Sequence, residues 1–267
     1  MKVMIFNDTQ NFNGSLNFLN SKFDVKSKRF WNYKKYIPLL IKKIKSLEDF
    51  NNPSLELKKV FFYEGKYSNK IMKNFNWSCN QEISKINQMV KREHNLLNLV
   101  SQSQCSKMLR NKVNKHVEET KKQLEEKKKD YIHYKQKQEK QFEGQKDFFE
   151  ELKNNPLIEI RYTPLKQHLG EVHQKGVDVL LATDLVHLAH MEAYDIAIIL
   201  SGDTDLIEAV KLIKSLGKIP IIISYHTPGN PLKSNISDLM TAGKFLNLRT
   251  NFSDQEILDM SDLKETK

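Results

Sequence analysis

Four aspartates stand where a folded chain could gather carboxylates. Asp8 follows the apolar run at residues 2–6 (KVMIF), and Asp203 and Asp205 follow a second apolar run, IAIIL, at residues 196–200. Asp178 stands at the expected start of a helix. Because ligands of open α/β sheets bind beyond the carboxyl ends of the strands, these acids are expected to form one site.

Carboxylates gathered in this way suit a divalent metal ion. Mg²⁺ and Mn²⁺ prefer oxygen ligands, and a bound ion neutralises charge, polarises a phosphoryl oxygen and lowers the pKa of an attacking water. A phosphodiester brings further negative charge, which such an ion makes tolerable. Two neutral residues are candidates to assist: Asn11 for a phosphate or a water, and Ser201 for a carboxylate.

Each acid also has a structural interpretation. Asp8 could begin a turn, and Asp178, Asp203 and Asp205 could stabilise helix N-termini. The pair Asp203 and Asp205 is harder to explain in this way, because one cap needs one acid. The D-x-D spacing is also found in haloacid-dehalogenase phosphatases, but there it opens the domain and Thr or Val follows where this chain has Ile207.

The elements that must position these acids alternate as in a parallel sheet covered by helices on both faces. The chain opens with strands near 2–6 and 59–63 and a helix around 37–47. After Pro156 the pattern predicts strands at 157–162, 195–200, 219–224 and 245–248, with helices at 177–191 and 204–216, the second ended by Gly217. The predicted fold class is α/β, a Rossmann-like parallel sheet.

The segment between these parts lacks any strand pattern. Residues 81–153 are expected to be helical, and residues 76–153 are interpreted as a long α-helical hairpin insertion in a discontinuous domain of residues 1–75 and 154–250. Residues 251–267 are expected to form a C-terminal tail. The insertion could be a spacer or a dimerising coiled coil, or a basic arm with Tyr131, His133 and Tyr134 available for base stacking.

Charge and cysteine content narrow the class of protein. The formal net charge is +10, with a basic first half and an acidic last third, as a polyanion-binding enzyme with an acidic centre would show. Cys79 and Cys105 are too few for a disulfide framework or a Cys-ligated zinc site, which favours a cytoplasmic protein. No stretch approaches the ~20 apolar residues of a spanning helix, so no membrane partner is expected.

Three segments together resemble the NYN domain, a PIN-like nuclease family: VMIFNDTQNF, KGVDVLLATDLVHLA and DIAIILSGDTDLIEAVKLIKSLGKIPIII. The resemblance covers residues 1–65 and 157–248. It implies metal-dependent RNA cleavage with metal-site acids at Asp8, Asp178, Asp203 and Asp205. Around these acids it implies candidates for supporting or substrate contacts, namely Asn11, Ser201, Asp184 and Lys175.

The chain departs from the family pattern in two places. The first motif usually reads Asp-Gly or similar before the Asn, whereas here Thr9 and Gln10 intervene before Asn11. Gly243 stands where the family often has an Asp before the last strand. The expected function is Mg²⁺- or Mn²⁺-dependent hydrolysis of RNA, with DNA left open as a substrate. The alternatives are a weak or inactive RNA-binding module whose insertion recruits a partner, and a phosphatase. A homodimer through the insertion is a further possibility.

Overall fold

The computed structural model describes residues 1–20, 29–47, 54–168, 171–226 and 236–263. The chain divides into two compact units. The first comprises residues 1–65, 150–163 and 174–267, and the second comprises residues 66–149 and 164–173. No helix among the described residues is long and apolar enough to cross a membrane.

The first unit is built on a six-stranded sheet in the order β4-β3-β1-β7-β8-β9. Its strands are β1 (Lys2–Asp8), β3 (Glu56–Lys66), β4 (Ile158–Pro164), β7 (Ile196–Leu200), β8 (Ile219–Ser224) and β9 (Lys244–Asn247). Four neighbouring pairs are parallel. The fifth pair, β3 and β4, is parallel as well, because hydrogen-bond partners rise together from Val60 with Leu157 to Lys66 with Leu165. The predicted fold class is confirmed.

The connections place a switch point between β1 and β7. From β1 the chain moves outward through β3 to β4, then returns to β7 beside β1 and moves the other way through β8 to β9. All five residues of β7 are buried, as expected of a central strand covered on both faces. Side chains that follow β1 and β7 therefore meet in the crevice where such sheets bind ligands.

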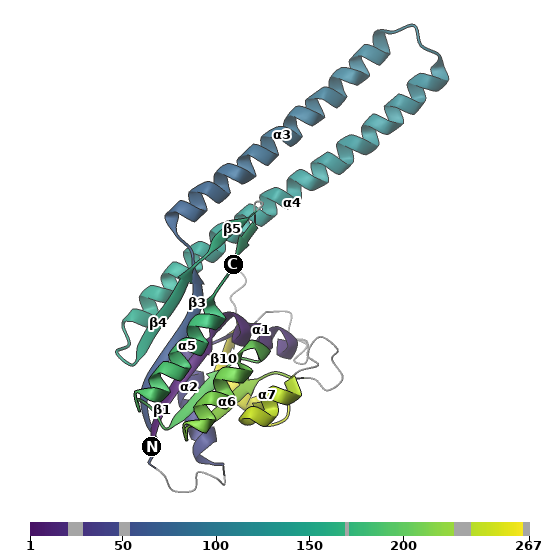
Figure 1. Cartoon of the computed structure of the whole chain (residues 1–267). Helices are drawn as coiled ribbons and strands as arrows, with labels where there is room; N and C mark the ends of the chain where they lie inside the picture. The colour runs from purple at the N-terminus through teal and green to yellow at the C-terminus, as the bar shows by residue number, and fades with distance from the viewer. Residues whose placement is uncertain (21–28, 48–53, 169–170, 227–235, 264–267) are drawn as a thin grey trace. The chain divides into compact units, whose positions relative to one another are not determined.

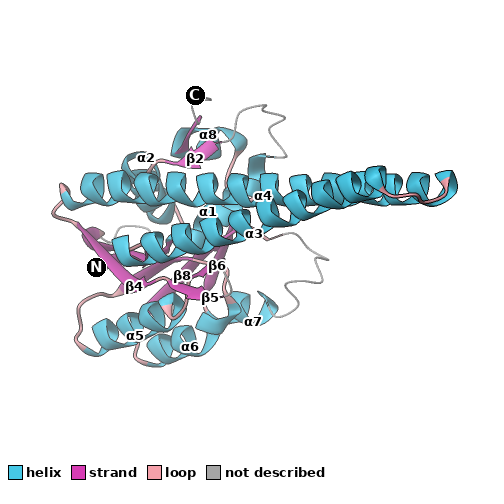
Figure 2. Cartoon of the chain, turned by 90° about the horizontal axis from the view of Figure 1, so that it is seen from above, coloured by secondary structure: helices cyan, strands magenta, loops and turns pink. Residues whose placement is uncertain are grey.

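Helices cover both faces of this sheet (Figure 2). On one face lie α5 (Val177–His190), α6 (Ile207–Ser215) and α7 (Ile236–Ala242), which share a core with Phe6, Ile199 and Ile222. On the other lie α1 (Thr9–Asn20) and α2 (Tyr33–Lys45). The expected helix at 204–216 is a 3₁₀ turn, η2 (Thr204–Leu206), followed by α6, and Gly217 ends it with a φ of 76°.

The C-terminal segment is part of the first unit. After the capping box of Ser253 and Glu256, α8 (Asp254–Met260) packs against α2, and β10 (Ser261–Leu263) pairs antiparallel with β2 (Arg29–Trp31). Lys43 and Lys35 form ion pairs with Glu256 and Asp262. Residues 254–263, expected within a separate tail, thus complete the layer around α2 and neutralise part of its basic charge.

The second unit is a long helical hairpin of α3 (Asn69–Gln102) and α4 (Lys107–Lys153), with a small hairpin of β5 (Lys166–His168) and β6 (Glu171–His173) (Figure 1). Its helix begins twelve residues before the expected position 81, after the N-cap Ser68. A small core of Met72, Phe75 and Cys79 holds its base.

Polar residues of α4 that interrupt its apolar spacing have defined partners at this base. The hydroxyl of Tyr67 donates to Gln138 Oε1 at 2.6 Å, and the backbone N–H of Tyr67 donates to Gln145 Oε1 at 2.9 Å. Tyr134 packs edge-on against Phe75, with ring centroids 5.5 Å apart. Tyr134 is therefore a packing residue here, and the expectation that it is available for base stacking is wrong.

Candidate metal centre

The first acid of the site is the last residue of the central strand β1. Asp8 lies on the same side of the sheet as Phe6, because side chains alternate along a strand, and only 3% of its surface is exposed. Its two carboxylate oxygens have separate donors. The backbone N–H of Asn11 donates to Oδ1 at 3.1 Å, and the hydroxyl of Ser201 donates to Oδ2 at 3.0 Å. These bonds fix the direction in which the carboxylate points.

The second acid follows the neighbouring strand β7. Asp203 accepts a hydrogen bond from the backbone N–H of Asp205 at 3.0 Å and so caps the 3₁₀ turn η2. Its own N–H donates to Ser201 Oγ at 3.1 Å. The capping interpretation and the site interpretation both hold for Asp203, since a carboxylate has a second oxygen available after it caps a turn.

The third acid enters from the first turn of α5. Gly176, which precedes this helix, has a φ of 83°, a left-handed conformation that residues with a side chain rarely adopt. This turn brings Asp178 to the carboxyl edge of the sheet. The sequence Gly176-Val177-Asp178 predicted a helix start at Asp178, but it did not predict the left-handed backbone conformation of Gly176.

The three carboxylates converge on one place. Asp8, Asp178 and Asp203 each offer one oxygen, and these three oxygens lie within 4.8 Å of one another. Among the described residues, no ion pair links any of the three to a basic side chain. The group combines hard oxygen donors with uncompensated negative charge, which fits a divalent metal ion.

Burial and mutual repulsion raise the pKa values of two of these carboxylates, Asp8 and Asp178. The pKa of Asp8 is raised to about 6, chiefly because burial disfavours its charged form and further because Asp178 and Asp203 repel it. Its hydrogen bonds from Asn11 and Ser201 act in the opposite direction. The pKa of Asp178 is also raised, first by burial and then by Asp203 and Asp205.

Ser201 and Asn11 join the two loops that carry the acids. Ser201 contacts Asp8 and the backbone of Asp203, as described, and Asn11 Oδ1 accepts a hydrogen bond from the backbone N–H of Gly202 at 2.9 Å. The expectation that Ser201 bonds a carboxylate agrees with this geometry. The side-chain oxygen of Asn11 ties the β1 loop to the β7 loop, and the expected contact of Asn11 with a phosphate or a water stays a prediction.

The remaining candidates lie apart from the three-acid group. Asp205 is exposed and is not a member of it. Asp184 accepts from the hydroxyl of Tyr63 at 3.1 Å and lies 3.5 Å from Nε of Arg161, in a separate polar contact between α5 and the sheet. Lys175 is exposed in the turn before α5. The helical rotation that separates Asp184 from Asp178 is as expected.

Comparison with known proteins decides the family. The NYN domain matches residues 98–240, which is more than half of the chain. The chain belongs to the NYN domain family. This family is one of PIN-like nucleases.

The NYN match covers Asp178, Asp203 and Asp205 but does not include Asp8. The match begins at residue 98, inside the hairpin. The resemblance seen in the sequence covered residues 1–65 and 157–248 and left the hairpin out. Asp8 is tied to the matched region by its contacts with Ser201 and by the pairing of β1 with β7.

One curated relative is similar over a short stretch. An uncharacterized protein, y4oD, from Sinorhizobium fredii (strain NBRC 101917 / NGR234) is 31% identical over 90 residues, which are 30% of this chain and 42% of that protein. The chain thus covers less than half of that relative's length. No solved structure matches the chain.

The departure from the NYN pattern at Gly243 has a steric cause. A Cβ at this position would lie 2.9 Å from the carbonyl oxygen of Pro220 and 3.1 Å from the side chain of Ile222. The backbone before β9 approaches β8 too closely for any side chain, so the Asp often found in the family does not fit here.

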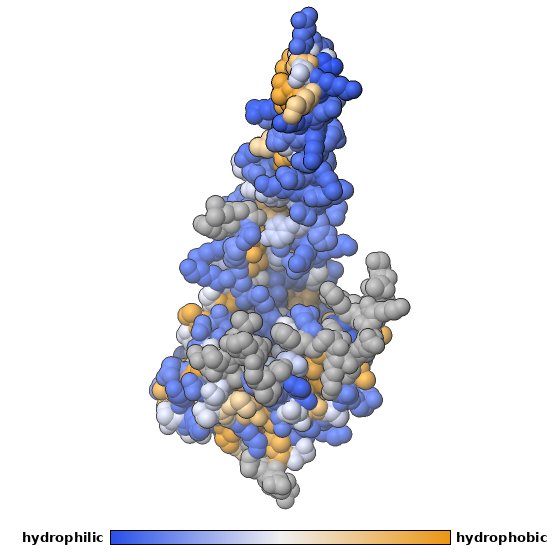
Figure 3. Space-filling model, turned by 90° about the vertical axis from the view of Figure 1, so that its right-hand side faces the viewer, coloured by the Kyte–Doolittle hydropathy of each residue, from blue (hydrophilic) through white to orange (hydrophobic). Residues whose placement is uncertain are grey.

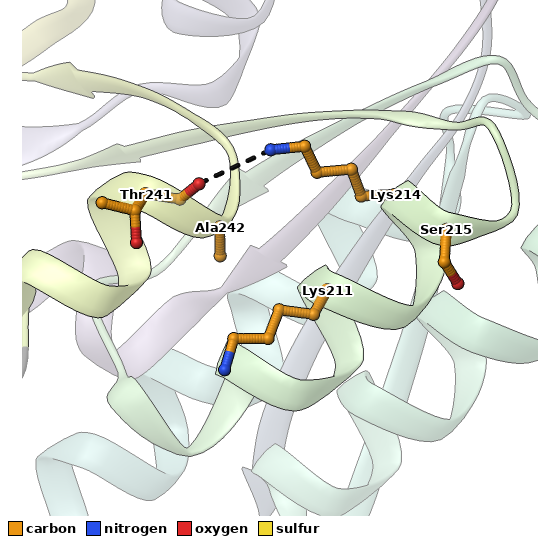
Figure 4. A pocket seen from close by; sticks show the side chains of 5 residues that line it. All are labelled: Lys211, Lys214, Ser215, Thr241 and Ala242. Carbon is orange, nitrogen blue, oxygen red and sulfur yellow. Dashed lines mark hydrogen bonds between the residues drawn. The ribbon is translucent and has the colours of Figure 1, made fainter.

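An open pocket in the first unit lies away from the acids, between α6 and α7 (Figure 4). Its cations are already engaged: Lys214 donates to the carbonyl oxygen of Thr241 at 3.5 Å, and Lys211 pairs with Glu208 at 2.8 Å. None of the three clustered aspartates lines this pocket. It is therefore no part of the candidate metal centre.

Proposed function

We propose that this NYN protein is a metal-dependent ribonuclease that hydrolyses RNA phosphodiester bonds with Mg²⁺ or Mn²⁺. The observation that carries the proposal is the convergence of Asp8, Asp178 and Asp203 within 4.8 Å at the switch point of the sheet. Membership of a PIN-like nuclease family supports the reaction class.

The donor set suits these two ions. Three carboxylates offer oxygen ligands only, and the described part of the chain adds no cysteine or histidine to the group. In the proposal Asp8, Asp178 and Asp203 hold the ion, and Asp205 lies at the exposed rim, where it can reach a water or a second ion. A bound ion supplies charge neutralisation, polarisation of the phosphoryl oxygen and a more acidic water.

The protein's own contribution is positioning. Ser201 holds the Asp8 carboxylate and the Asp203 backbone at once, while Asn11 keeps the β1 loop against Gly202. These bonds are formed before any ligand arrives, so the acids need little reorganisation during the reaction. Asp184 and Lys175 are assigned outer roles, Asp184 in orienting α5 and Lys175 as a candidate contact for a phosphate.

RNA is preferred as substrate because the family resemblance points to it and the chain carries a formal net charge of +10. In this proposal, Lys and Arg of residues 22–45 and of the helical insertion are candidates to grip the RNA backbone. Residues 22–28 of that range lie outside the described residues, and Lys34, Lys35 and Lys43 are paired with acids. A cytoplasmic setting agrees with two free cysteines, Cys79 and Cys105.

The test is cleavage of labelled single-stranded RNA, structured RNA and DNA with Mg²⁺, Mn²⁺ or EDTA. Asp203→Asn is compared with Asp238→Asn, a matched change of an exposed acid on α7. We expect metal-dependent cleavage of RNA that Asp203→Asn loses and Asp238→Asn keeps. Cleavage that persists in EDTA or in Asp203→Asn would overturn the proposed site.

The alternative function is an RNA-binding or assembly module without turnover. The intact set of three clustered acids argues against it, since a site without catalysis has no need to keep uncompensated carboxylates together. Binding of RNA without cleavage under every metal condition would establish this alternative instead.

A further inference from the structure

The positive charge of the helical hairpin is concentrated at one end. We define the distal segment as residues 83–117, which contain the end of α3, the connecting turn and the start of α4. This segment holds 7 Lys+Arg and a single acid, Glu93. The shaft segment, residues 118–149 of α4, holds 9 Lys+Arg and 8 Asp+Glu. The shaft is nearly neutral, and the distal segment is strongly basic.

Among the described residues few cations of either segment form ion pairs, so the two segments differ in their acid content and not in the pairing of their cations. In the shaft segment Lys121 and Lys128 pair with acids three residues before them. In the distal segment Lys85 and Lys115 pair with acids just outside it, Glu82 and Glu119. The described structure shows no ion pair for its other exposed cations Lys91, Arg92, Lys107 and Lys112. These side chains are exposed and present their charge to solvent.

Hydrogen bonds stabilise the turn that connects α3 and α4. Ser106 Oγ accepts from the backbone N–H of Leu109 at 3.3 Å, and an Arg110 guanidinium nitrogen donates to the carbonyl oxygen of Ser103 at 3.1 Å. Apolar side chains also stand out from it, with Leu99 66% and Met108 68% exposed. Figure 3 shows a hydrophobic patch among hydrophilic side chains near the end of the hairpin.

We propose that the distal segment is a binding site for RNA phosphates, a second contact that the enzyme makes with its substrate. This inference rests on the proposed function for the choice of RNA. Cations without partners on two antiparallel helices can bind successive phosphates of one strand, and the exposed Leu99 and Met108 can cover ribose or base surfaces. Such contacts position a nucleic acid without reading its sequence.

Charge argues against the other occupants of this surface. A second copy of the chain would bring the same basic surface to the same place, and like charges repel, so the segment is poorly suited to tip-to-tip dimerisation. A partner protein with an acidic rim would satisfy the charge, and it remains an outcome of the test.

The contribution of these cations is measurable through salt. Each single-strand phosphate neutralised by the protein adds about 0.7 to the slope of log affinity against log salt. Loss of three contacts should reduce the slope by about 2 and weaken binding roughly tenfold at moderate salt.

The experiment compares two triple variants of the full chain. The distal variant reverses three exposed charges: Lys91→Glu, Lys107→Glu and Lys112→Glu. The shaft variant also reverses three exposed charges: Lys122→Glu, Lys127→Glu and Lys129→Glu. Binding of a labelled RNA is measured by anisotropy in EDTA, so that cleavage does not interfere. We expect the distal variant to lose about tenfold in affinity and the shaft variant to lose less than about threefold.

A probe on Cys105 gives an independent readout. Cys105 lies in the turn and is partly exposed, whereas Cys79 is buried. A fluorophore on Cys105 should change its emission when RNA binds. Equal losses in both variants, or no loss in either, would overturn the proposal. So would a silent probe, which would point to a partner other than RNA.

These outcomes are separable from the proposed nuclease function. Binding in EDTA does not require the metal centre, and cleavage with Mg²⁺ or Mn²⁺ is measured on the same variants. Intact cleavage with unchanged RNA affinity would remove the distal site alone. Distal-dependent binding without cleavage would remove the nuclease function alone.

Discussion

The metal centre and the distal segment of the hairpin treat charge in opposite ways. At the carboxyl edge of the sheet, buried Asp8 lies close to the partly buried Asp178 and Asp203, and Ser201 and Asn11 fix the direction of the Asp8 carboxylate. In the distal segment, Lys91, Arg92, Lys107 and Lys112 are exposed on helix surfaces, and the described structure shows no ion pair for any of them. Charged groups interact more strongly where they are buried, because the local dielectric constant is low. Exposed charges interact weakly, and salt screens them.

The difference predicts how each region responds to change. A buried, coupled site should fail when one member is replaced, because the remaining groups cannot rearrange. An exposed array should weaken in steps, one phosphate contact at a time. The largest effects are therefore expected at the metal centre.

Replacement of Asp178 by Asn should lower cleavage by about 100-fold or more, because a metal site that loses one of three carboxylates loses several kcal/mol of charge stabilisation. The matched change Asp205→Asn should lower it by less than about tenfold, because Asp205 is exposed and outside the group. Single-turnover cleavage rates at saturating Mn²⁺ measure both. Equal losses would place Asp205 in the centre after all.

The acidity of Asp8 should make the metal-free protein less stable as pH rises. The folded chain keeps the proton up to its raised pKa of about 6, whereas the unfolded chain releases it near the ordinary pKa of 3.8. The folded state thus binds more protons between these values, so the free energy of unfolding falls across this window, by up to about 3 kcal/mol.

Asp8→Asn removes this charge and should flatten that fall, and added Mg²⁺ should oppose it in the wild-type protein by binding the folded state. Chemical denaturation at pH 4.5 and pH 7, in EDTA, measures the effect. Lys107→Gln in the distal segment is the control and should leave the pH dependence unchanged. A wild-type protein whose stability rises across this window would contradict the raised pKa.

The sequence predicted those parts of the fold whose residues are covered on both faces. The runs IAIIL at 196–200 and IPIII at 219–223 are apolar throughout, so the predicted strands at 195–200 and 219–224 agree with β7 and β8 to within one residue. By contrast, α1 (TQNFNGSLNFLN) went unassigned, because only Phe12, Leu16 and Leu19 mark its buried side. The three-residue strands β2 and β10 form through pairing between distant segments, which no local pattern contains.

The sequence predicted that acidic residues form a site, but it did not predict which of them lie together. Strand ends and a helix start identified Asp8, Asp203 and Asp178, because sheet topology brings such positions together. Asp205 was expected to share the site with Asp203; it is exposed and lies outside the three-acid group, so its place in the site stays a prediction. Tyr134 was also misjudged, because its partner Phe75 lies on the other helix of the hairpin.

Removal of the Ser201 hydroxyl should affect both stability and rate. Ser201→Ala leaves a buried Asp8 oxygen without its donor and frees the backbone N–H of Asp203, so a loss of about 1–3 kcal/mol of stability is expected. Cleavage should fall about tenfold, and Ser201→Thr should recover part of it by restoring the hydroxyl. A rate unchanged by Ser201→Ala would show that the acids are held by other means.

The smallest expected effects are those of two glycine substitutions on stability, one at the sheet edge and one in the hairpin. Gly243→Ala places a Cβ 2.9 Å from the carbonyl oxygen of Pro220, so the sheet edge must shift, at a cost of about 1–3 kcal/mol. Gly144→Ala in α4 meets nothing within 4 Å and replaces a poor helix former, so it should stabilise by about 0.5–1 kcal/mol.

Urea unfolding of the two variants gives both free energies. Opposite signs would confirm that the sheet edge is tightly packed while the hairpin surface has space for a side chain. If Gly243→Ala is harmless, the close approach of β8 to position 243 is not what excludes the family's aspartate. Gly243→Asp should then be tolerated as well.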